Sequence, residues 1–200
     1  INLMEKTYIR VGNNEYEKLY GSYGLTTLKD KHVKIGGNTI QFTFPGKKGV
    51  EQHVSVSSKK LANAIKQCRD VPGKTLFQFY TPGEKHQAID SGMVNHYIKE
   101  AAGQDFSAKD FRTWAGTLQA LKCLGPLENM PDEKLLKKNM LGVIDTVSAR
   151  LGNTRAICKK YYIHPCLFRL YEEGKLQDYM KKRGKKNTQQ GDFSPSEHLL

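Results

Sequence analysis

Two segments of this chain carry residues that suit chemistry on a phosphodiester. Tyr162 follows two lysines and a second tyrosine, and Arg112 ends the short polar segment that starts at Lys109. A tyrosine phenolate can attack phosphorus and form a reversible covalent phosphodiester. An arginine can hold the phosphate under attack, because its planar guanidinium gives two hydrogen bonds at once and keeps its charge. The two segments therefore predict a transesterification at phosphorus.

The same reaction needs an acid that protonates the departing oxygen. Lysine suits this role, because neighbouring cations lower its pKa. Each candidate taken alone also fits an ordinary structural role. Arg112 suits a surface or capping position, Tyr162 suits the edge of a core, and Lys47 suits a solvated turn. Only the combination of these residues favours a catalytic role over a structural one.

The charge balance of the chain favours a polyanionic partner. The sequence holds 32 lysines and arginines against 20 aspartates and glutamates, and the net charge of +12 most simply serves nucleic-acid binding. A hydrophobic fraction of 38% with 26% charged residues is typical of a globular protein and excludes an intrinsically disordered chain. The length suits one domain with a proper core.

Several classes of site are missing from the sequence. The four cysteines form no Cys-x-x-Cys pair, and the histidines show no metal-ligand spacing. There is no Gly-x4-Gly-Lys-Ser/Thr loop for ATP and no acidic cluster suited to magnesium. No apolar run has membrane-spanning length, and no signal peptide is visible. We therefore expect an intracellular protein without cofactor or metal, in the cytoplasm or nucleoid, or in the nucleus or virion of a eukaryotic or viral source.

The first third of the chain predicts a helix and then a small sheet. Residues 1 to about 20 place apolar side chains at helical spacing. Between residues 26 and 56 the period changes to two, and turn signals at residues 36–38 and 45–49 separate three candidate strands. We expect these strands to form a three-stranded antiparallel sheet.

The sequence pattern of the rest of the chain predicts mainly helices. Helix starts are expected at Ser57 or Ser58, at Asp90 or Ser91, at Ser107 and at Pro131. The third of these helices is expected to stop near residue 125 and the fourth near residue 150. The fold class is therefore α+β, mainly α-helical, with a small three-stranded antiparallel sheet near the N-terminus followed by a helical bundle.

Residues 1–180 are expected to form the catalytic domain. Residues 181–200 are rich in basic and polar side chains and are expected to form a frayed C-terminal tail. The chain opens at Ile1, within a helical pattern, rather than at a methionine. We therefore expect an N-terminal lobe of the full protein to precede it.

Four segments, residues 5–12, 24–33, 107–117 and 162–165, carry motifs in an order that resembles the catalytic domain of type IB DNA topoisomerases. The bacterial and poxvirus-like group is the most similar, and the resemblance covers nearly the whole chain. It implies the fold that tyrosine recombinases and type IB topoisomerases share. It also implies a monomer that acts on duplex DNA, cleaves one strand through a 3′-phosphotyrosyl link, relaxes supercoils by strand rotation and religates without ATP or metal.

By the same resemblance, four residues take catalytic roles. Arg10 matches the family's first catalytic arginine and Arg112 its second. Lys47 matches the general-acid lysine, and its separation of 37 positions from Arg10 favours it over Lys48. Tyr162 matches the nucleophile.

Tyr161 is the rival of Tyr162 by chemistry alone. Neighbouring residues on a helix point about 100° apart, so only one of the two can face the phosphate.

Asn153 stands where poxvirus and cellular eukaryotic members have a histidine that donates a hydrogen bond to the phosphate. An asparagine amide also donates but stays neutral, and the bacterial-type branch is similar to this chain in using asparagine. We therefore expect Asn153 to act in catalysis, although asparagine also caps helices well. Arg155 stands where the family commonly has proline, and it is either an additional phosphate contact or a neutral surface change.

The resemblance places four further residues against the DNA backbone: Tyr16, Thr27, Lys31 and Lys109.

Two other functions stay open. A tyrosine site-specific recombinase usually has His-x-x-Arg where this chain has Lys109 to Arg112, and His or Trp at the position of Asn153. Both differences favour the topoisomerase. A catalytically inactive DNA-binding module would bind DNA with a steep salt dependence and form no covalent adduct. The complete set of matching catalytic positions argues against it.

Overall fold

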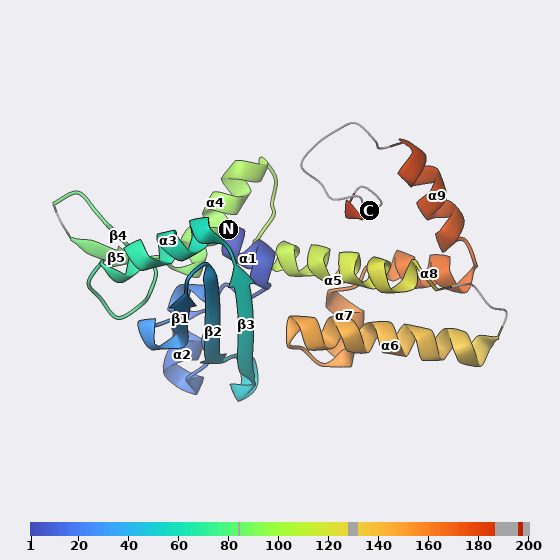
Figure 1. Cartoon of the computed structure of the whole chain (residues 1–200), viewed down its shortest axis with the longest axis horizontal. Helices are drawn as coiled ribbons and strands as arrows, with labels where there is room; N and C mark the ends of the chain where they lie inside the picture. Colours follow the sequence, from blue (N-terminus) through green and yellow to red (C-terminus); the bar gives the residue numbers. More distant parts are fainter. Residues whose placement is uncertain (84, 128–131, 187–195, 198–200) are drawn as a thin grey trace. The chain divides into compact units, whose positions relative to one another are not determined.

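The computed structural model describes residues 1–83, 85–127, 132–186 and 196–197, and the chain divides into two compact units, Ile1–Phe111 and Arg112–Leu200. The first unit combines helices with strands, and the described part of the second is helical (Figure 1). The predicted fold class, α+β and mainly helical, is confirmed.

The first unit is built from short helices and two antiparallel sheets. Its elements are α1 (Asn2–Thr7), α2 (Asn14–Tyr20), the 3-10 helices η1 (Leu25–Thr27) and η2 (Asp30–His32), β1 (Val33–Gly36), β2 (Thr39–Pro45), the 3-10 helix η3 (Lys47–Gly49), β3 (Glu51–Ser57), α3 (Lys59–Arg69), β4 (Gln78–Tyr80), β5 (His86–Ala88) and α4 (Ser91–Ala102). The small β4–β5 hairpin was not predicted from the sequence.

The predicted three-stranded sheet is present with the order β1-β2-β3. Its register pairs Val33 with Phe42 and Ile40 with Val56. Along β2, Ile40, Phe42 and Phe44 are buried and the residues between them are not. This alternation is the two-residue period that the sequence displays, and it fixes which face of the sheet packs inward.

The prediction of one helix over residues 1 to about 20 is wrong, because α1 ends at Thr7. Tyr8 adopts a left-handed conformation with φ 55°, which stops the helix. The next helix, α2, begins only after Asn13, whose side chain accepts hydrogen bonds from the backbone N–H groups of Glu15 and Tyr16. The non-helical segment between the two helices contains Arg10.

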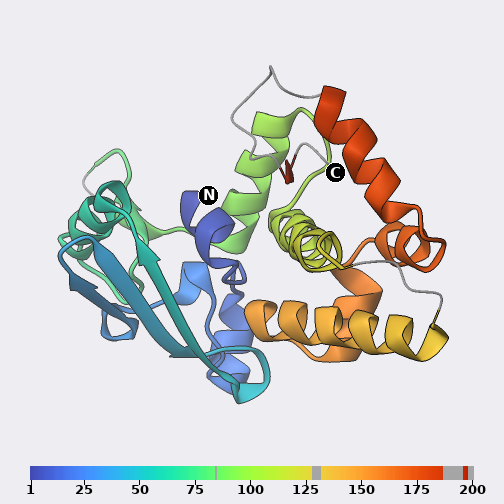
Figure 2. The same ribbon diagram turned by 45° about the vertical axis from the view of Figure 1, so that its right-hand side comes forward.

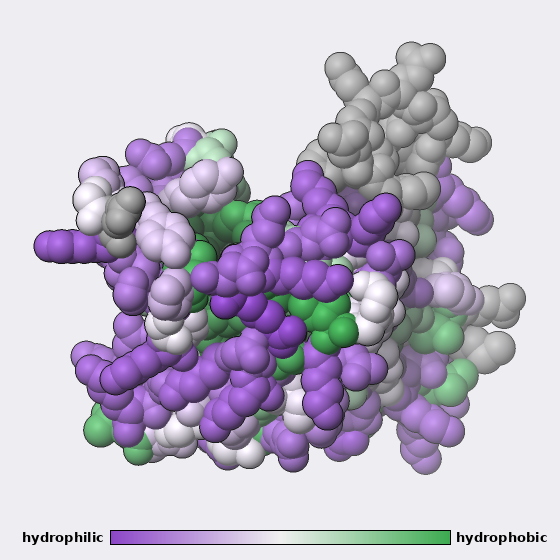
Figure 3. Space-filling model, turned by 60° about the vertical axis from the view of Figure 1, so that its left-hand side comes forward, coloured by the Kyte–Doolittle hydropathy of each residue, from purple (hydrophilic) through white to green (hydrophobic). Residues whose placement is uncertain are grey.

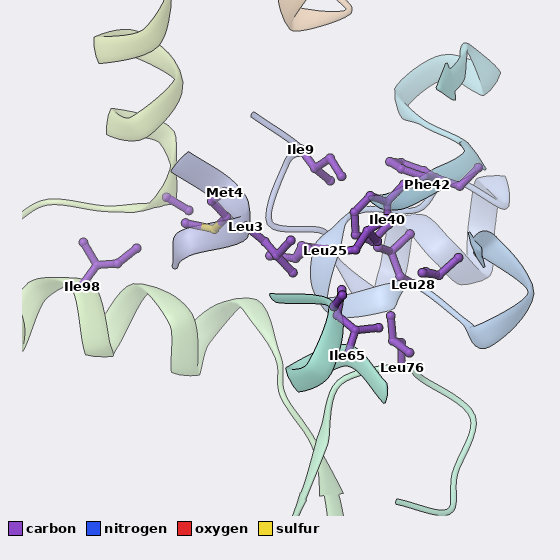
Figure 4. Close-up of a cluster of buried hydrophobic side chains, with 14 residues drawn as sticks. Leu3, Met4, Ile9, Leu25, Leu28, Ile40, Phe42, Ile65, Leu76 and Ile98 are labelled. Carbon is purple, nitrogen blue, oxygen red and sulfur yellow. The ribbon is translucent and has the colours of Figure 1, made fainter. Parts of the chain in front are cut away.

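Both sheet and helices of the first unit contribute to one hydrophobic core (Figure 4). Leu28, Ile40 and Phe42 are fully buried at its centre. Met4 of α1 and Ile65 of α3 are also part of this core, so both helices pack against it. Burial of this kind is the main favourable term in folding, so α1 and the segment after it are held by the core rather than by helix propensity.

The second unit is formed by the helices that follow residue 111. They are α5 (Ala108–Leu124), which begins in the last residues of the first unit, α6 (Glu133–Leu151), α7 (Arg155–Tyr161), α8 (Pro165–Glu172) and α9 (Leu176–Lys186). The predicted start of α6 at Pro131 falls outside the described residues, and Asp132 caps this helix. Helix α9 runs to Lys186, so residues 181–186 are helical and the prediction of a frayed segment there is wrong. Apart from residues 196–197, the remainder of the predicted tail lies outside the described residues.

Three of the predicted helix starts are confirmed by their caps. Ser58 caps α3 and Asp90 caps α4. At the start of α5 the carboxylate of Asp110 accepts hydrogen bonds from the backbone N–H and the hydroxyl of Ser107, at 2.8 and 2.9 Å. The aspartate of the Lys109-to-Arg112 motif therefore fixes the beginning of the helix that carries Arg112.

His32 is a buried histidine at the end of η2. Its Nδ1 accepts a hydrogen bond from the backbone N–H of Lys29 (3.1 Å), and its ring meets the ring of Tyr23 edge-on, with the centroids 4.4 Å apart. A ring that accepts at Nδ1 is neutral. Burial, and then the positive charges of Lys31 and Lys29, lower the pKa of His32, while the charge of Glu17 opposes them.

Acidification is expected to destabilise the first unit through His32. Because its pKa is lower in the folded chain than in the unfolded chain, the unfolded state binds the proton first. The contribution of neutral His32 to stability is therefore fully present above the unfolded pKa of about 6.5. It is lost as the pH falls from there through the lowered pKa of the folded chain. The free energy of urea unfolding, measured between about pH 7.5 and about pH 5, should fall more steeply for the wild type than for His32→Asn. Parallel pH dependences would contradict this role.

None of the helices in the described parts of the chain is long and apolar enough to cross a membrane. The face drawn in Figure 3 is covered mostly by hydrophilic side chains, with hydrophobic residues visible only in patches between them.

Candidate active site

Arg112 is a buried arginine anchored to the end of another helix. Its side chain lies on α5 and is only 4% exposed. The Nη2 group donates a hydrogen bond to the backbone carbonyl of Leu151, the last residue of α6, at 2.7 Å. The C-terminus of a helix carries partial negative charge, so this carbonyl both orients the guanidinium and stabilises its positive charge.

Asn153 also contacts the carbonyl of Leu151 at the end of α6. Its Nδ2 donates to the Leu151 oxygen at 3.3 Å, and its backbone N–H donates to the carbonyl of Ser148 at 3.0 Å. Gly152, between them, adopts a left-handed conformation with φ 57°. This turn reverses the chain after α6 and brings Asn153 to the carbonyl that Arg112 also contacts.

Tyr162 lies at the C-terminal end of α7, next to Arg112. The Arg112 Cζ atom is 5.1 Å from the centroid of the Tyr162 ring. Helix α7 is capped by Thr154, whose hydroxyl accepts a hydrogen bond from the backbone N–H of Ile157. Figures 1 and 2 show α7 connecting α6 to α8 beside α5. The second unit thus brings Arg112, Asn153 and Tyr162 together.

The two adjacent tyrosines have different surroundings. The Tyr162 ring is half-buried against the guanidinium of Arg112. The Tyr161 ring is 45% exposed and lies 5.1 Å from the Nζ atom of Lys160. A phosphate held by Arg112 would therefore lie nearer to Tyr162 than to Tyr161.

Arg155 forms a bidentate ion pair with Asp145 of α6, with Nη2 to Oδ2 at 2.7 Å. The carboxylate raises the pKa of the guanidinium through this hydrogen bond and its charge. Since both side chains are exposed, the pair contributes little to stability. It does link the start of α7 to α6 across the loop that contains Asn153.

Arg10 belongs to the first unit, in the non-helical segment after α1. Its backbone carbonyl accepts a hydrogen bond from the N–H of Leu25 at 2.8 Å, and Val11 is held in the same way by Thr26 at 2.7 Å. The close approach of these two backbone segments requires glycine at position 24, because a Cβ atom there would lie 2.6 Å from the Arg10 oxygen and 2.5 Å from Gly12.

Lys47 is exposed at the tip of the hairpin that joins β2 to β3. The turn is closed by the N–H of Gly46, which donates to the carbonyl of Val50 at 2.8 Å. The N–H of Tyr23 donates to the carbonyl of Pro45 at the base of this turn, also at 2.8 Å. Because Leu25 bonds to Arg10, residues 23–25 connect the backbone of Arg10 to the base of the hairpin whose tip carries Lys47.

The four predicted DNA contacts differ in exposure. Tyr16 is 52% exposed, and Lys31 and Lys109 are exposed as well. Thr27 is fully buried, and its hydroxyl donates to the carbonyl of Gly24 and accepts from the N–H of the same residue. Thr27 therefore stabilises the turn that holds Arg10, and its side chain lacks the exposure that a DNA contact needs.

Sequence reasoning missed the groups that orient the site in the second unit. These are the carbonyl of Leu151 and a small polar face of α5 formed by Thr113, Gly116 and Thr117. A backbone carbonyl leaves no trace in a sequence. The glycine inside α5 was the available signal, because a glycine within a helix costs stability and indicates a close approach.

No group of three or more His, Cys, Asp or Glu side chains suited to a metal ion occurs among the residues that the structure describes. The contacts in the second unit bring together the guanidinium of Arg112, the amide of Asn153 and the phenol of Tyr162. These groups can bind a phosphate and attack it.

Comparison with known proteins identifies the family. Residues 1–190 match the family described as eukaryotic DNA topoisomerase I, catalytic core. DNA topoisomerase 1B of Acanthamoeba polyphaga mimivirus is 31% identical over 171 residues, covering 82% of this chain and 51% of the relative. DNA topoisomerase 1B of Vaccinia virus (strain Copenhagen) is 26% identical over 189 residues, covering 90% and 55%. The chain spans about half the length of the curated relatives it matches. By the extent of these matches, the chain belongs to the type IB DNA topoisomerases, within their catalytic core.

Proposed function

We propose that this chain cleaves and rejoins one strand of duplex DNA, and that in the full protein this reaction relaxes supercoils. The Tyr162 oxygen attacks phosphorus, the bond to the 5′ oxygen breaks, and a 3′-phosphotyrosyl link and a 5′-hydroxyl result. The phosphotyrosine link conserves the energy of the broken bond, so religation needs neither ATP nor a metal. The observation that carries the proposal is the buried guanidinium of Arg112 beside the Tyr162 ring, 5.1 Å from its centroid.

The other residues complete the chemistry. Arg112, Asn153 and Arg10 stabilise the charge that develops on the non-bridging oxygens of the phosphorane. Support comes from the shared anchor of Arg112 and Asn153 on Leu151, which holds two donors of different charge side by side. Lys47 donates the proton that the departing 5′ oxygen takes up, and its exposed position at a hairpin tip leaves it accessible to a substrate.

Duplex DNA is the proposed partner of the chain, which acts as a monomer in the compartment that holds the DNA. The exposed side chains of Tyr16, Lys31 and Lys109 suit contacts to phosphates, which position a protein on DNA without reading sequence. For Thr27 we propose a supporting role through the Arg10 turn instead.

The test is a covalent adduct formed without metal or ATP. The chain is mixed with a duplex that is nicked so that the cleaved 5′ fragment dissociates and traps the intermediate, in EDTA, and the products are separated on a denaturing gel. We expect a protein–DNA band that a protease removes. A short duplex isolates the chemical step from strand rotation and from enclosure of a longer DNA.

An inactive DNA-binding module is the competing outcome. It would bind the same duplex, with an affinity that falls steeply as salt rises, and give no adduct at any time. Binding without an adduct under these conditions would overturn the proposed function.

A further inference from the structure

The segment that carries Tyr162 rests on one face of α5. The Thr113 hydroxyl donates to the carbonyl of Tyr161 at 3.4 Å, and the Thr117 hydroxyl donates to the carbonyl of Tyr162 at the same distance. Thr117 also accepts a hydrogen bond from the backbone N–H of His164 at 3.1 Å. A single hydroxyl thus bridges backbone groups on both sides of Ile163, and Thr117 is only 6% exposed.

Tyr162 is the residue at which the helix ends, and its carbonyl depends on this hydroxyl. Its backbone has left the helical conformation, with φ −124° and ψ −8°. The N–H groups of Tyr162 and Ile163 both donate to the carbonyl of Cys158, at 3.0 and 3.1 Å. The N–H side of Tyr162 is therefore fixed by α7, and its carbonyl side is fixed by α5 through Thr117.

Gly116 permits the close approach that these hydrogen bonds need. A Cβ atom at this position would lie 2.2 Å from the carbonyl oxygen of Tyr162 and 3.1 Å from its Cβ atom. Real contacts are not that short, and the obstacle is backbone, which cannot rotate away. Gly116 is one helical turn from Arg112, on the same face of α5. One helix face thus holds both the phosphate-binding arginine and the backbone of the nucleophile.

We propose that Thr117 is a positioning residue for Tyr162, with Gly116 providing the space for it. The bridge between α5 and the carbonyl of Tyr162 sets the phenol at a fixed place relative to Arg112. A displacement of about 1 Å at a reacting centre can reduce a rate by about 10²-fold. This inference rests on the proposed function, because the phenol of Tyr162 has to be the nucleophile for its position to matter.

The test compares Thr117→Val with Thr117→Ser in single-turnover cleavage at saturating DNA. Valine keeps the volume and removes the hydroxyl, and serine keeps the hydroxyl. We expect cleavage to be about tenfold slower with valine, the effect of losing one hydrogen bond in a transition state, and close to the wild-type rate with serine. Thr146→Val is the matched control, since the Thr146 hydroxyl is exposed and donates within its own helix to Gly142.

Two further readouts separate positioning from general loosening of the fold. A displaced nucleophile destabilises the transition state that cleavage and religation share, so both rates fall while the dissociation constant for DNA stays unchanged. A loosened fold would weaken DNA binding and lower the melting temperature in proportion. Equal cleavage rates for Thr117→Val and wild type, or a loss that serine does not restore, would overturn the inference.

Gly116→Ala gives an independent measure of the same contact. The added methyl group must push the Tyr162 segment away from α5, so we expect a larger loss of cleavage rate, about 10²-fold, with DNA binding retained. If wild-type chain formed no adduct, the proposed function would fail and this role with it. If the wild type formed the adduct and both Thr117→Val and Gly116→Ala cleaved at the wild-type rate, only the positioning role would fail.

Discussion

Replacing Tyr162 with phenylalanine is expected to abolish the covalent protein–DNA adduct, whereas Tyr161→Phe should leave it close to the wild-type level. Each substitution removes one oxygen and keeps the ring, so the packing changes little. The difference comes from the surroundings of the two rings. Tyr162 lies against the buried guanidinium of Arg112, while Tyr161 is exposed beside Lys160. The measurement is the fraction of trapped duplex that becomes covalently bound on a denaturing gel.

DNA binding is the internal control for this pair of variants. Both proteins should bind the same duplex with the wild-type affinity, because phosphate contacts by lysine and arginine supply most of the binding free energy. An adduct that persists in Tyr162→Phe and disappears in Tyr161→Phe would assign the nucleophile to Tyr161. Loss in both variants would indicate that the turn between α7 and α8 had changed.

The sheet of the first unit was predictable because its pattern is simple. Ile40, Phe42 and Phe44 alternate with polar residues, and glycine-rich turns separate the strands. The helix prediction for residues 1 to about 20 failed because apolar spacing continues past the point at which Tyr8 enters a left-handed conformation. The hydrogen bonds of Arg10 and Val11 with Leu25 and Thr26 hold this segment outside a helix. Residues distant in sequence supply those contacts.

Tyr162 and Arg112 were proposed because their residue types suit the chemistry, and the catalytic roles of Arg10, Lys47 and Asn153 came from the resemblance of short motifs to type IB topoisomerases. Their support was not predictable in the same way. The carbonyl of Leu151 is a backbone group, and its importance depends on how α6 ends at Gly152. Thr117 resembled any threonine inside a helix until its contacts with Tyr162 and His164 were seen. Sequence patterns indicate which side chains are present, and packing decides which backbone groups they meet.

Lys47→Ala is expected to slow cleavage of an ordinary phosphodiester by about 10²–10⁴-fold, the usual contribution of a general acid. The loss should largely disappear on a duplex in which sulfur replaces the bridging 5′ oxygen at the cleavage site. A thiolate leaves without being protonated, because a thiol is far more acidic than an alcohol. The measurement is the ratio of single-turnover cleavage rates on the two duplexes, for wild type and variant.

Lys48→Ala is the matched control, because Lys48 is the next residue of the same exposed hairpin tip and carries the same charge. It should cleave both duplexes at nearly the wild-type rate, so that loss of a positive charge at this tip is separated from loss of the acid. Tyr162→Phe should stay inactive on the sulfur duplex, since a better leaving group does not replace a missing nucleophile. If Lys47→Ala were equally slow on both duplexes, Lys47 would act by binding the phosphate or the DNA, and the proton would have to come from another residue.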